Sequence, residues 1–363
     1  MSQPPRTRLA MIDGIRGIGA ISIALYHIFR YGPLPLAADA VVPDPVRWCI
    51  DHGWIAVQFF LVISGFGAAY ATLNQVLPIG AVRVYLVRRL IRLGGAYWAT
   101  IALSTVLTAI AILALDDRSF NESLPTLGQI AAHIAFLQDI IDYENLTTGI
   151  WFLSIDLQFG VVFILLLKLA QSTAEQMSGD ASRPGILPLA IWFGPLTLYS
   201  LFVSVRLSAT EMWFHHFFCM PMLGAVVCWT VYGGLRPRVF WTYATLIQAQ
   251  VIRVFVEEEV FMLEVALALM AGSIIYCAAR LGSIETWLNN PLMQYLGRIS
   301  YSLFLIHYPV SWVIGWIGVR LTGDQPWAAL GWLLAELLAS IGAAHLLYTH
   351  VEQPSLAWAK RVH

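Results

Sequence analysis

Long apolar stretches recur along this chain of 363 residues. A window of about twenty apolar residues is long enough to cross the hydrocarbon core of a bilayer as a helix. The pattern predicts ten such helices, at 10–30, 53–73, 95–115, 149–170, 186–206, 213–232, 238–256, 261–280, 300–320 and 327–348. The seventh and eighth are the weakest, because Arg253 and the acidic run Glu257, Glu258 and Glu259 lie between them.

The composition indicates an all-α, polytopic membrane protein. Hydrophobic residues make up 58% of the chain, charged residues only 12%, and the mean hydropathy is +0.70. A soluble domain carries about 25% charged residues. The formal net charge of −1 gives no support for nucleic-acid binding. The four cysteines are scattered without a CxxC spacing, so neither a disulfide framework nor a metal site is predicted.

The distribution of charge in the loops predicts the orientation of the helices. Basic residues collect in one set of short loops, as expected for the cytoplasmic side. They include Arg8, Arg83, Arg88, Arg89, Arg92, Lys168, Arg183, Arg236, Arg238, Arg280, Arg298, Lys360 and Arg361. With ten spans, both termini are then cytoplasmic, and residues 1–363 are expected to form a single membrane domain with no appended soluble domain. The longest loop, 116–148, is expected outside, where it covers a site or folds as a short helical insert.

The first predicted span carries Asp13, Arg16 and His27. Charged groups inside a spanning helix are costly and usually face the protein interior or a watery cavity. Arg16 and His27 are eleven residues apart, so they project from one helix face, about 16 Å apart along the axis. Histidine is the usual proton acceptor for activating a hydroxyl. The alternative is that Asp13 and Arg16 occupy an interfacial turn and that His27 only packs.

An arginine cluster precedes the third span. Arg89 and Arg92 are three residues apart, with Arg88 adjacent, so two guanidinium groups face the same way on a helix. Guanidinium groups bind phosphate through two hydrogen bonds and stay charged in a low-dielectric site. The cluster could dock a cytosolic phosphorylated donor, or it could be an ordinary positive-inside anchor.

Further candidates are scattered through the other spans. Ser64 belongs to a small-residue stretch that indicates close helix packing, and nothing in the sequence places a base beside it. Trp151, Ser154 and Asp156 open the fourth span, where an acid could pair with a base, cap the helix or help to hold a substrate. For His307, two residues before Pro309, packing or a secondary contact is favoured over a role as a second base.

Six motifs in order resemble the acyltransferase 3 family of integral membrane acyltransferases. They are IDGIRGIGAISIALYHIF, FFLVISGF, RVYLVRRLIRL, WFLSIDLQF, LGRISYSLFLIHYP and the terminal VEQP, and together they cover nearly the whole chain. Members of the family O-acetylate or otherwise acylate cell-surface polysaccharides and some small molecules. The family usually has glutamate where this chain has Asp156, and a tyrosine-proline or similar where it has Gly94 and Gly95.

The resemblance implies a bacterial enzyme of the inner, cytoplasmic membrane that moves an acyl group, most simply acetyl, from acyl-CoA to a hydroxyl of a carbohydrate or related acceptor. His27 would be the general base, and Arg16 would hold the donor or stabilise negative charge, with Asp13 orienting it or starting the helix. Acetyl-CoA or another acyl-CoA would bind at Arg88, Arg89 and Arg92, without a metal. Trp151, Ser154 and Asp156 would lie near the acceptor or support the pocket. The other classes considered are a transporter or flippase of lipid-linked sugars and a non-catalytic scaffold or sensor.

Overall fold

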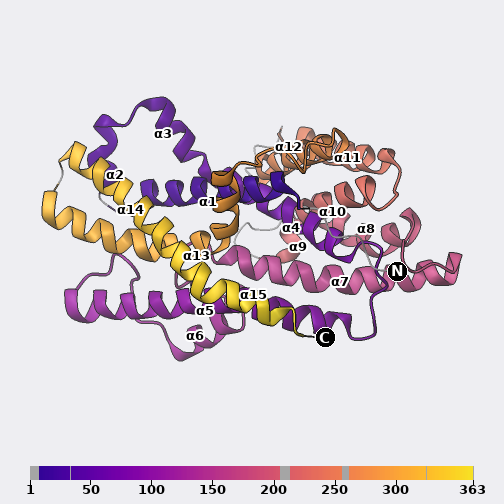
Figure 1. The fold of residues 1–363 in the computed structure, drawn as a ribbon, viewed down its shortest axis with the longest axis horizontal. Coiled ribbons are helices and arrows are strands. Elements are labelled where there is room, and N and C mark those ends of the chain that lie inside the picture. Colours follow the sequence, from indigo (N-terminus) through magenta and orange to yellow (C-terminus); the bar gives the residue numbers. More distant parts are fainter. Residues whose placement is uncertain (1–7, 33, 205–212, 256–260, 324, 363) are drawn as a thin grey trace. The chain divides into compact units, whose positions relative to one another are not determined.

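The computed structural model describes residues 8–32, 34–204, 213–255, 261–323 and 325–362, and every regular element in these ranges is helical (Figure 1). The acidic run Glu257, Glu258 and Glu259 lies outside the described residues. All ten predicted spans coincide with helices. These are α1 (Ala10–Arg30), α4 (Ala56–Thr72), α5 (Ala81–Leu115), α7 (Trp151–Ser178), α8 (Ile186–Phe202), α10 (Cys219–Val231), α11 (Pro237–Phe255), α12 (Phe261–Arg280), α13 (Pro291–Thr322) and α14 (Pro326–Leu347).

Among the described residues, seven helical segments are long and apolar enough to cross a membrane, and α8 and α10 are shorter apolar helices. The prediction of an all-helical, polytopic membrane protein is therefore confirmed. The seventh predicted span differs. Its helix, α11, is not one of these nine segments, because Arg238, Gln248, Gln250 and Arg253 lower its hydropathy.

Shorter helices connect the long ones. They are α2 (Leu34–Ala38), α3 (Asp44–Asp51), α6 (Leu127–Ile134), α9 (Phe214–Phe217) and α15 (Gln353–Ala359). Helix α6 lies in the long loop 116–148, which therefore does contain a short helical insert. It begins at Thr126, whose Oγ1 accepts a hydrogen bond from the Gln129 amide at 3.1 Å, a typical N-cap. Trp98 of α5 donates its indole N–H to the Ile134 carbonyl at 3.1 Å, which holds α6 beside α5 (Figure 1).

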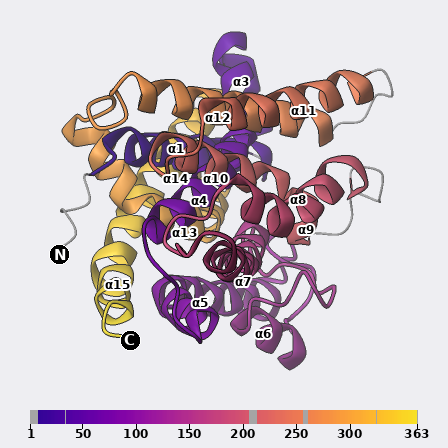
Figure 2. The same ribbon diagram turned by 90° about the vertical axis from the view of Figure 1, so that its right-hand side faces the viewer.

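Contacts divide the chain into two compact units, whose boundaries fall within α1, α4, α5 and α7 and just before α13. Residues 1–12, 57–86 and 155–289 form the first. Its centre is α10, whose side chains are buried from Cys219 to Thr230, among α8, α11 and α12 (Figure 2). A Cβ on Gly224 would overlap the Val62 carbonyl of α4. A helix that is apolar and buried on all sides belongs to the core of a bundle.

Residues 13–56, 87–154 and 290–363 form the second unit. Helices α13 and α14 pack along each other, and α2 lies against α14 (Figure 1). A cluster of buried aliphatic side chains fills the space between α1, α2 and α14. Its members are Ile28, Leu34, Ala38, Val42, Ala329 and Leu333.

Two glycines bring α1 and α13 into backbone contact. A Cβ on Gly17 would lie 2.7 Å from the Gly297 nitrogen, and a Cβ on Gly297 would overlap the Asp13 carbonyl. Small residues are the usual way for membrane helices to approach this closely. His27 and His307 each lie ten residues beyond their glycine, about 15 Å along a helix. The crossing therefore sets the relative height of these two histidines.

We expect Gly297→Ala to lower the stability of the detergent-solubilised protein by about 1–3 kcal/mol, because the added methyl group would push α13 away from α1. The measurement is the free energy of unfolding, or the thermal midpoint, against the parent. Gly331→Ala in α14 is the matched control, because a Cβ there has no atom within 4 Å. Equal stability of the two variants would contradict the proposed contact.

Candidate active site

His27 of α1 and His307 of α13 form a stacked pair. Their ring centroids are 5.0 Å apart with an interplanar angle of 9°, and His27 Nδ1 lies 2.7 Å from His307 Nε2. His307 is fully buried. The sequence favoured packing or a secondary contact for His307, and the structure places it directly against the candidate base.

The hydrogen bonds of this pair assign the tautomer of each neutral ring. His307 Nδ1 lies 3.0 Å from the Leu303 carbonyl, and because a carbonyl can only accept, this nitrogen carries the proton. The Nε2 of His307 is then an acceptor, so His27 Nδ1 donates to it. The proton of neutral His27 therefore lies on Nδ1, and its Nε2 is the nitrogen that can accept a further proton.

An open cavity of about 310 Å³ adjoins this pair, a volume at the lower end of the range of about 300–1,000 Å³ for small-molecule sites. His27, Tyr31 and Tyr308 line one side of it, and the rest of the lining comes from the loop 116–148 and the residues that follow it. Those residues are Phe120, Asn121, Asn145, Thr147, Thr148, Gly149 and Trp151. The prediction that this loop covers a site therefore agrees with its position.

Gly149 lets the end of the loop approach His27. Its φ of +85° lies in the left-handed region that favours glycine. A Cβ at Gly149 would lie 3.8 Å from His27 Cε1 and 3.3 Å from Phe304 Cζ. A side chain here would be strained and would intrude between the loop and the histidine pair.

Polar bonds behind the cavity fix its two asparagines. Asn121 Nδ2 donates to Thr108 Oγ1 at 2.7 Å, and Asn145 Nδ2 donates to Asp139 Oδ1 at 3.0 Å. Burial raises the pKa of Asp139, and the hydrogen bond from Asn145 opposes that shift. The sequence analysis assigned no role to either asparagine, because the only pattern there, the short Asn-x-Ser/Thr sequence that each one begins, often arises by chance.

The predicted arginines have different surroundings, and two of them interact with a residue that the sequence analysis did not select. Arg88 donates Nε and Nη2 to the Val362 carbonyl, at 2.9 and 2.7 Å. Arg89 is half-buried and Arg92 exposed. Both Arg92 and Arg16 interact electrostatically with the buried carboxylate of Glu352. The available signal was a single acid near the end of the last apolar segment, just before Pro354.

The remaining candidates have structural partners. In the first unit, Ser64 of α4 donates its Oγ to Asp156 Oδ1 of α7, so an acid does lie beside this serine. In the second unit, Ser154 donates to the Phe136 carbonyl at 2.9 Å, and the Asp13 carbonyl lies at the Gly297 crossing. Trp151 lines the cavity. Helix α5 continues unbroken through Gly94 and Gly95.

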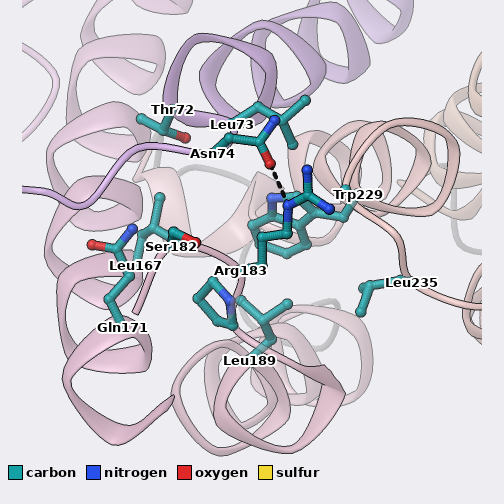
Figure 3. A pocket seen from close by; sticks show the side chains of 12 residues that line it. Thr72, Leu73, Asn74, Leu167, Gln171, Ser182, Arg183, Leu189, Trp229 and Leu235 are labelled. Carbon is teal, nitrogen blue, oxygen red and sulfur yellow. Dashed lines mark hydrogen bonds between the residues drawn. The ribbon is translucent and has the colours of Figure 1, made fainter. Parts of the chain in front are cut away.

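A second cavity lies in the first unit, among α4, α7 and α10 and the segment before α8. Figure 3 shows its lining, where Arg183 Nε donates to Asn74 Oδ1 at 2.7 Å. Its volume is only about 30 Å³, room for one or two water molecules. None of the predicted site residues lines it, so the cavity at His27 is the candidate active site.

Comparison with known proteins shows the family to which this chain belongs. Residues 9–349 match the family described as acyltransferase domain, so the chain belongs to that family and is a multi-pass membrane acyltransferase. A relative from Komagataeibacter xylinus, named "Putative membrane-bound transacylase BcsY", is 31% identical over 173 residues. The match covers 46% of this chain and 39% of the relative, so the chain spans well under two thirds of that protein. No solved structure gives a significant match.

The loop that lines the cavity should loosen as the pH falls. His133 Nδ1 lies 2.8 Å from the Gln129 carbonyl, and its Nε2 accepts from the Leu146 amide at 3.1 Å. Burial lowers the pKa of His133 below its usual 6.5. The unfolded loop therefore takes up a proton before the folded loop does, and stability is lost as the pH drops below about 6.5.

Hydrogen–deuterium exchange of residues 127–150, corrected for intrinsic rates, should accelerate below pH 6.5 in the parent. In His133→Gln this acceleration should be absent, because glutamine does not titrate. The same pH dependence in both proteins would show that His133 is not the responsible group.

Proposed function

We propose that this membrane acyltransferase moves an acyl group, most simply acetyl, from acyl-CoA to a hydroxyl of a carbohydrate or related acceptor. The observation that carries the proposal is the hydrogen bond from His27 Nδ1 to His307 Nε2 beside an open cavity. This bond leaves Nε2 of His27 as the basic nitrogen, which is what general-base activation of a hydroxyl requires.

The reaction balances with His27 alone as the proton carrier. The acceptor hydroxyl gives its proton to His27 Nε2 while its oxygen attacks the thioester carbonyl. The tetrahedral intermediate collapses, the carbon–sulfur bond breaks, and the proton on Nε2 passes to the departing thiolate. His307 Nε2 accepts the Nδ1–H bond throughout and so stabilises the imidazolium that forms between the two steps.

The position of Arg16 favours a role in holding the donor. Arg16 and His27 lie on the same unbroken helix, about 16 Å apart along its axis. An arginine side chain cannot reach across that distance to an oxyanion beside His27. Its interaction with Glu352, shared with Arg92, groups it with the arginines instead. The phosphates of acyl-CoA would bind at Arg88, Arg89 and Arg92, and the long pantetheine arm would carry the thioester to His27.

The lining of the cavity supports a carbohydrate acceptor. Tyr31, Trp151 and Tyr308 offer aromatic faces, on which the C–H faces of a sugar ring can pack. Asn121 and Asn145 add amide groups that can bond to hydroxyls. Small-molecule sites commonly combine aromatic walls with a few fixed polar groups.

The orientation of the protein in the membrane is inferred from the basic residues of its loops. We place the protein in the bacterial inner, cytoplasmic membrane with both termini in the cytoplasm, the arginines on the donor side and the loop 116–148 on the outer side. The name of the Komagataeibacter relative supports acyl transfer as the activity, and residues 1–363 would act as one functional domain.

The test is release of CoA from acetyl-CoA by the purified protein in detergent, with and without a panel of sugar acceptors. We expect acceptor-dependent release by the parent and a loss of at least about 100-fold in His27→Ala, because the general base is gone. His52→Ala is the matched control, because His52 is a histidine of the same unit whose side chain lies against the exposed Trp48, with its Nδ1 2.7 Å from the Trp48 carbonyl and its ring stacked on the indole.

Unchanged release by His27→Ala would contradict the assignment of the base. If the parent neither binds CoA nor releases it with any acceptor, the acyl-CoA donor is wrong. Movement of lipid-linked sugars in proteoliposomes would then be measured, to test the transporter class.

A further inference from the structure

The amide of Asn145, in the wall of the candidate active site, has its orientation fixed by a carboxylate. Its Nδ2 donates to Asp139 Oδ1 at 3.0 Å, while Gln138 Nε2 donates to Asp139 Oδ2 at 2.8 Å. An ionised carboxylate can only accept hydrogen bonds, so the nitrogen of Asn145 faces Asp139 and its Oδ1 faces away. Asn145 lines the cavity and Asp139 does not, so Oδ1 is the atom that this amide offers to a ligand.

Asn121, which also lines the cavity, is oriented in the same way. Its Nδ2 lies 2.7 Å from Thr108 Oγ1 and 3.4 Å from the Leu146 carbonyl. The carbonyl can only accept, and the Thr108 hydroxyl already donates its proton to the Ser104 carbonyl at 2.8 Å, so both partners require the nitrogen. The contact with Leu146 also places the Asn121 side chain beside the residue that follows Asn145.

Two oxygens of the lining have no hydrogen bond within the protein. Asn145 Oδ1 and Thr147 Oγ1 have no partner among the described residues, although Thr147 is only 3% exposed. A buried oxygen without a hydrogen bond costs free energy, and each such atom in a native structure requires an explanation. Both residues line the cavity, where a hydroxyl of a bound molecule can donate to them.

The polar atoms that the structure fixes in this lining are hydrogen-bond acceptors. Nε2 of His27 and the oxygens of the two asparagines can only accept, and no arginine or lysine is among the described residues that line the cavity. A sugar hydroxyl can donate to each of these atoms. An ionised carboxylate or phosphate cannot donate, and it would lie near Asp139 without a compensating cation. The lining therefore favours a neutral, hydroxyl-rich acceptor over an anionic one.

We propose that Asn145 is a specificity-determining residue that recognises a hydroxyl of a neutral sugar through Oδ1, and that Asp139 is the positioning residue that holds its amide in this orientation. This inference rests on the proposed function, because it assumes a hydroxyl acceptor in the cavity beside His27. The recognised hydroxyl is not the one that reacts, because a hydroxyl has one proton and the reacting one donates it to His27. Fixing the amide before the sugar arrives removes an entropic cost from binding.

A purely structural role for Asn145 leads to a different expectation. If the residue served only to fasten the loop to Asp139, its loss would impair every acceptor alike. Recognition of one hydroxyl makes the loss depend on whether the sugar carries that hydroxyl, because a polar group left unpaired rejects the analogue that lacks its partner. A set of monodeoxy sugars therefore separates the two roles.

The experiment uses the neutral methyl glycoside that reacts fastest in the sugar panel, its monodeoxy derivatives and the matching uronic acid. KM and kcat are measured for each at saturating acetyl-CoA. We expect the parent to have a lower KM for the neutral glycoside than for the uronic acid. In Asn145→Ala the KM of the glycoside should rise about tenfold or more, while the KM of acetyl-CoA stays the same. One monodeoxy derivative, which lacks the recognised hydroxyl, should have the same KM in both proteins.

Gln129→Ala is the matched control for damage to the loop. Gln129 Nε2 donates to the Glu144 carbonyl at 2.8 Å, so this variant also removes a side-chain hydrogen bond of the loop, but Gln129 does not line the cavity. Its KM for the glycoside should match that of the parent.

Asp139→Asn covers the case in which Asn145→Ala fails to fold. Its amide has one oxygen for two amide nitrogens, so Asn145 is no longer held in one orientation. The KM of the glycoside should rise less than in Asn145→Ala but clearly above the parent. A parent-like KM in either folded variant, an equal rise for every monodeoxy derivative, or a parent that prefers the uronic acid overturns the inference and leaves the proposed function intact. Transfer by the parent to no sugar of the panel overturns the carbohydrate acceptor, and the inference with it.

Discussion

The hydrogen bond between the half-buried His27 and the fully buried His307 is the interaction on which the rest of this site depends. Each imidazole ring has two polar nitrogen atoms, and burying a nitrogen without a hydrogen bond in a low-dielectric interior costs free energy. The Leu303 carbonyl accepts a hydrogen bond from the protonated Nδ1 of His307. The Nε2 of His307 in turn accepts one from the protonated Nδ1 of His27. Each hydrogen bond in this series fixes which nitrogen of the next ring carries the proton. The series therefore leaves Nε2 of His27 as the basic nitrogen. The glycine crossing of α1 and α13 then acts as the support that keeps the two rings in register.

Helix α1 also separates the two ends of the proposed reaction. Arg16 lies in the first half of α1, and His27 lies three turns further on, beside the cavity lined by the loop. A rigid helix keeps this spacing constant, which suits a donor whose anionic head and reactive thioester are far apart.

The sequence was sufficient for features that depend on local periodicity. Apolar windows placed the long helices, and helical spacing placed Arg16 and His27 on one face of α1. It was insufficient where a role depends on a distant partner. His307 contacts a residue 280 positions away, and the buried Glu352 has its hydrogen-bond partner, Ser302, 50 positions earlier. Ser64 similarly acquires its acid partner through the packing of α4 on α7. Composition windows also overestimated α11, whose apolar residues are interrupted by arginines and glutamines.

The tautomer of His27 tests the central claim most directly. Selective ¹⁵N-histidine labelling, with His27→Gln used to assign the signal, distinguishes a proton on Nδ1 from one on Nε2 through the long-range couplings of the ring. The account predicts the Nδ1–H tautomer for neutral His27, and a shift towards the Nε2–H form when His307→Ala removes its acceptor. An Nε2–H tautomer in the parent, or a signal that does not respond to His307→Ala, would contradict the proposed histidine pair.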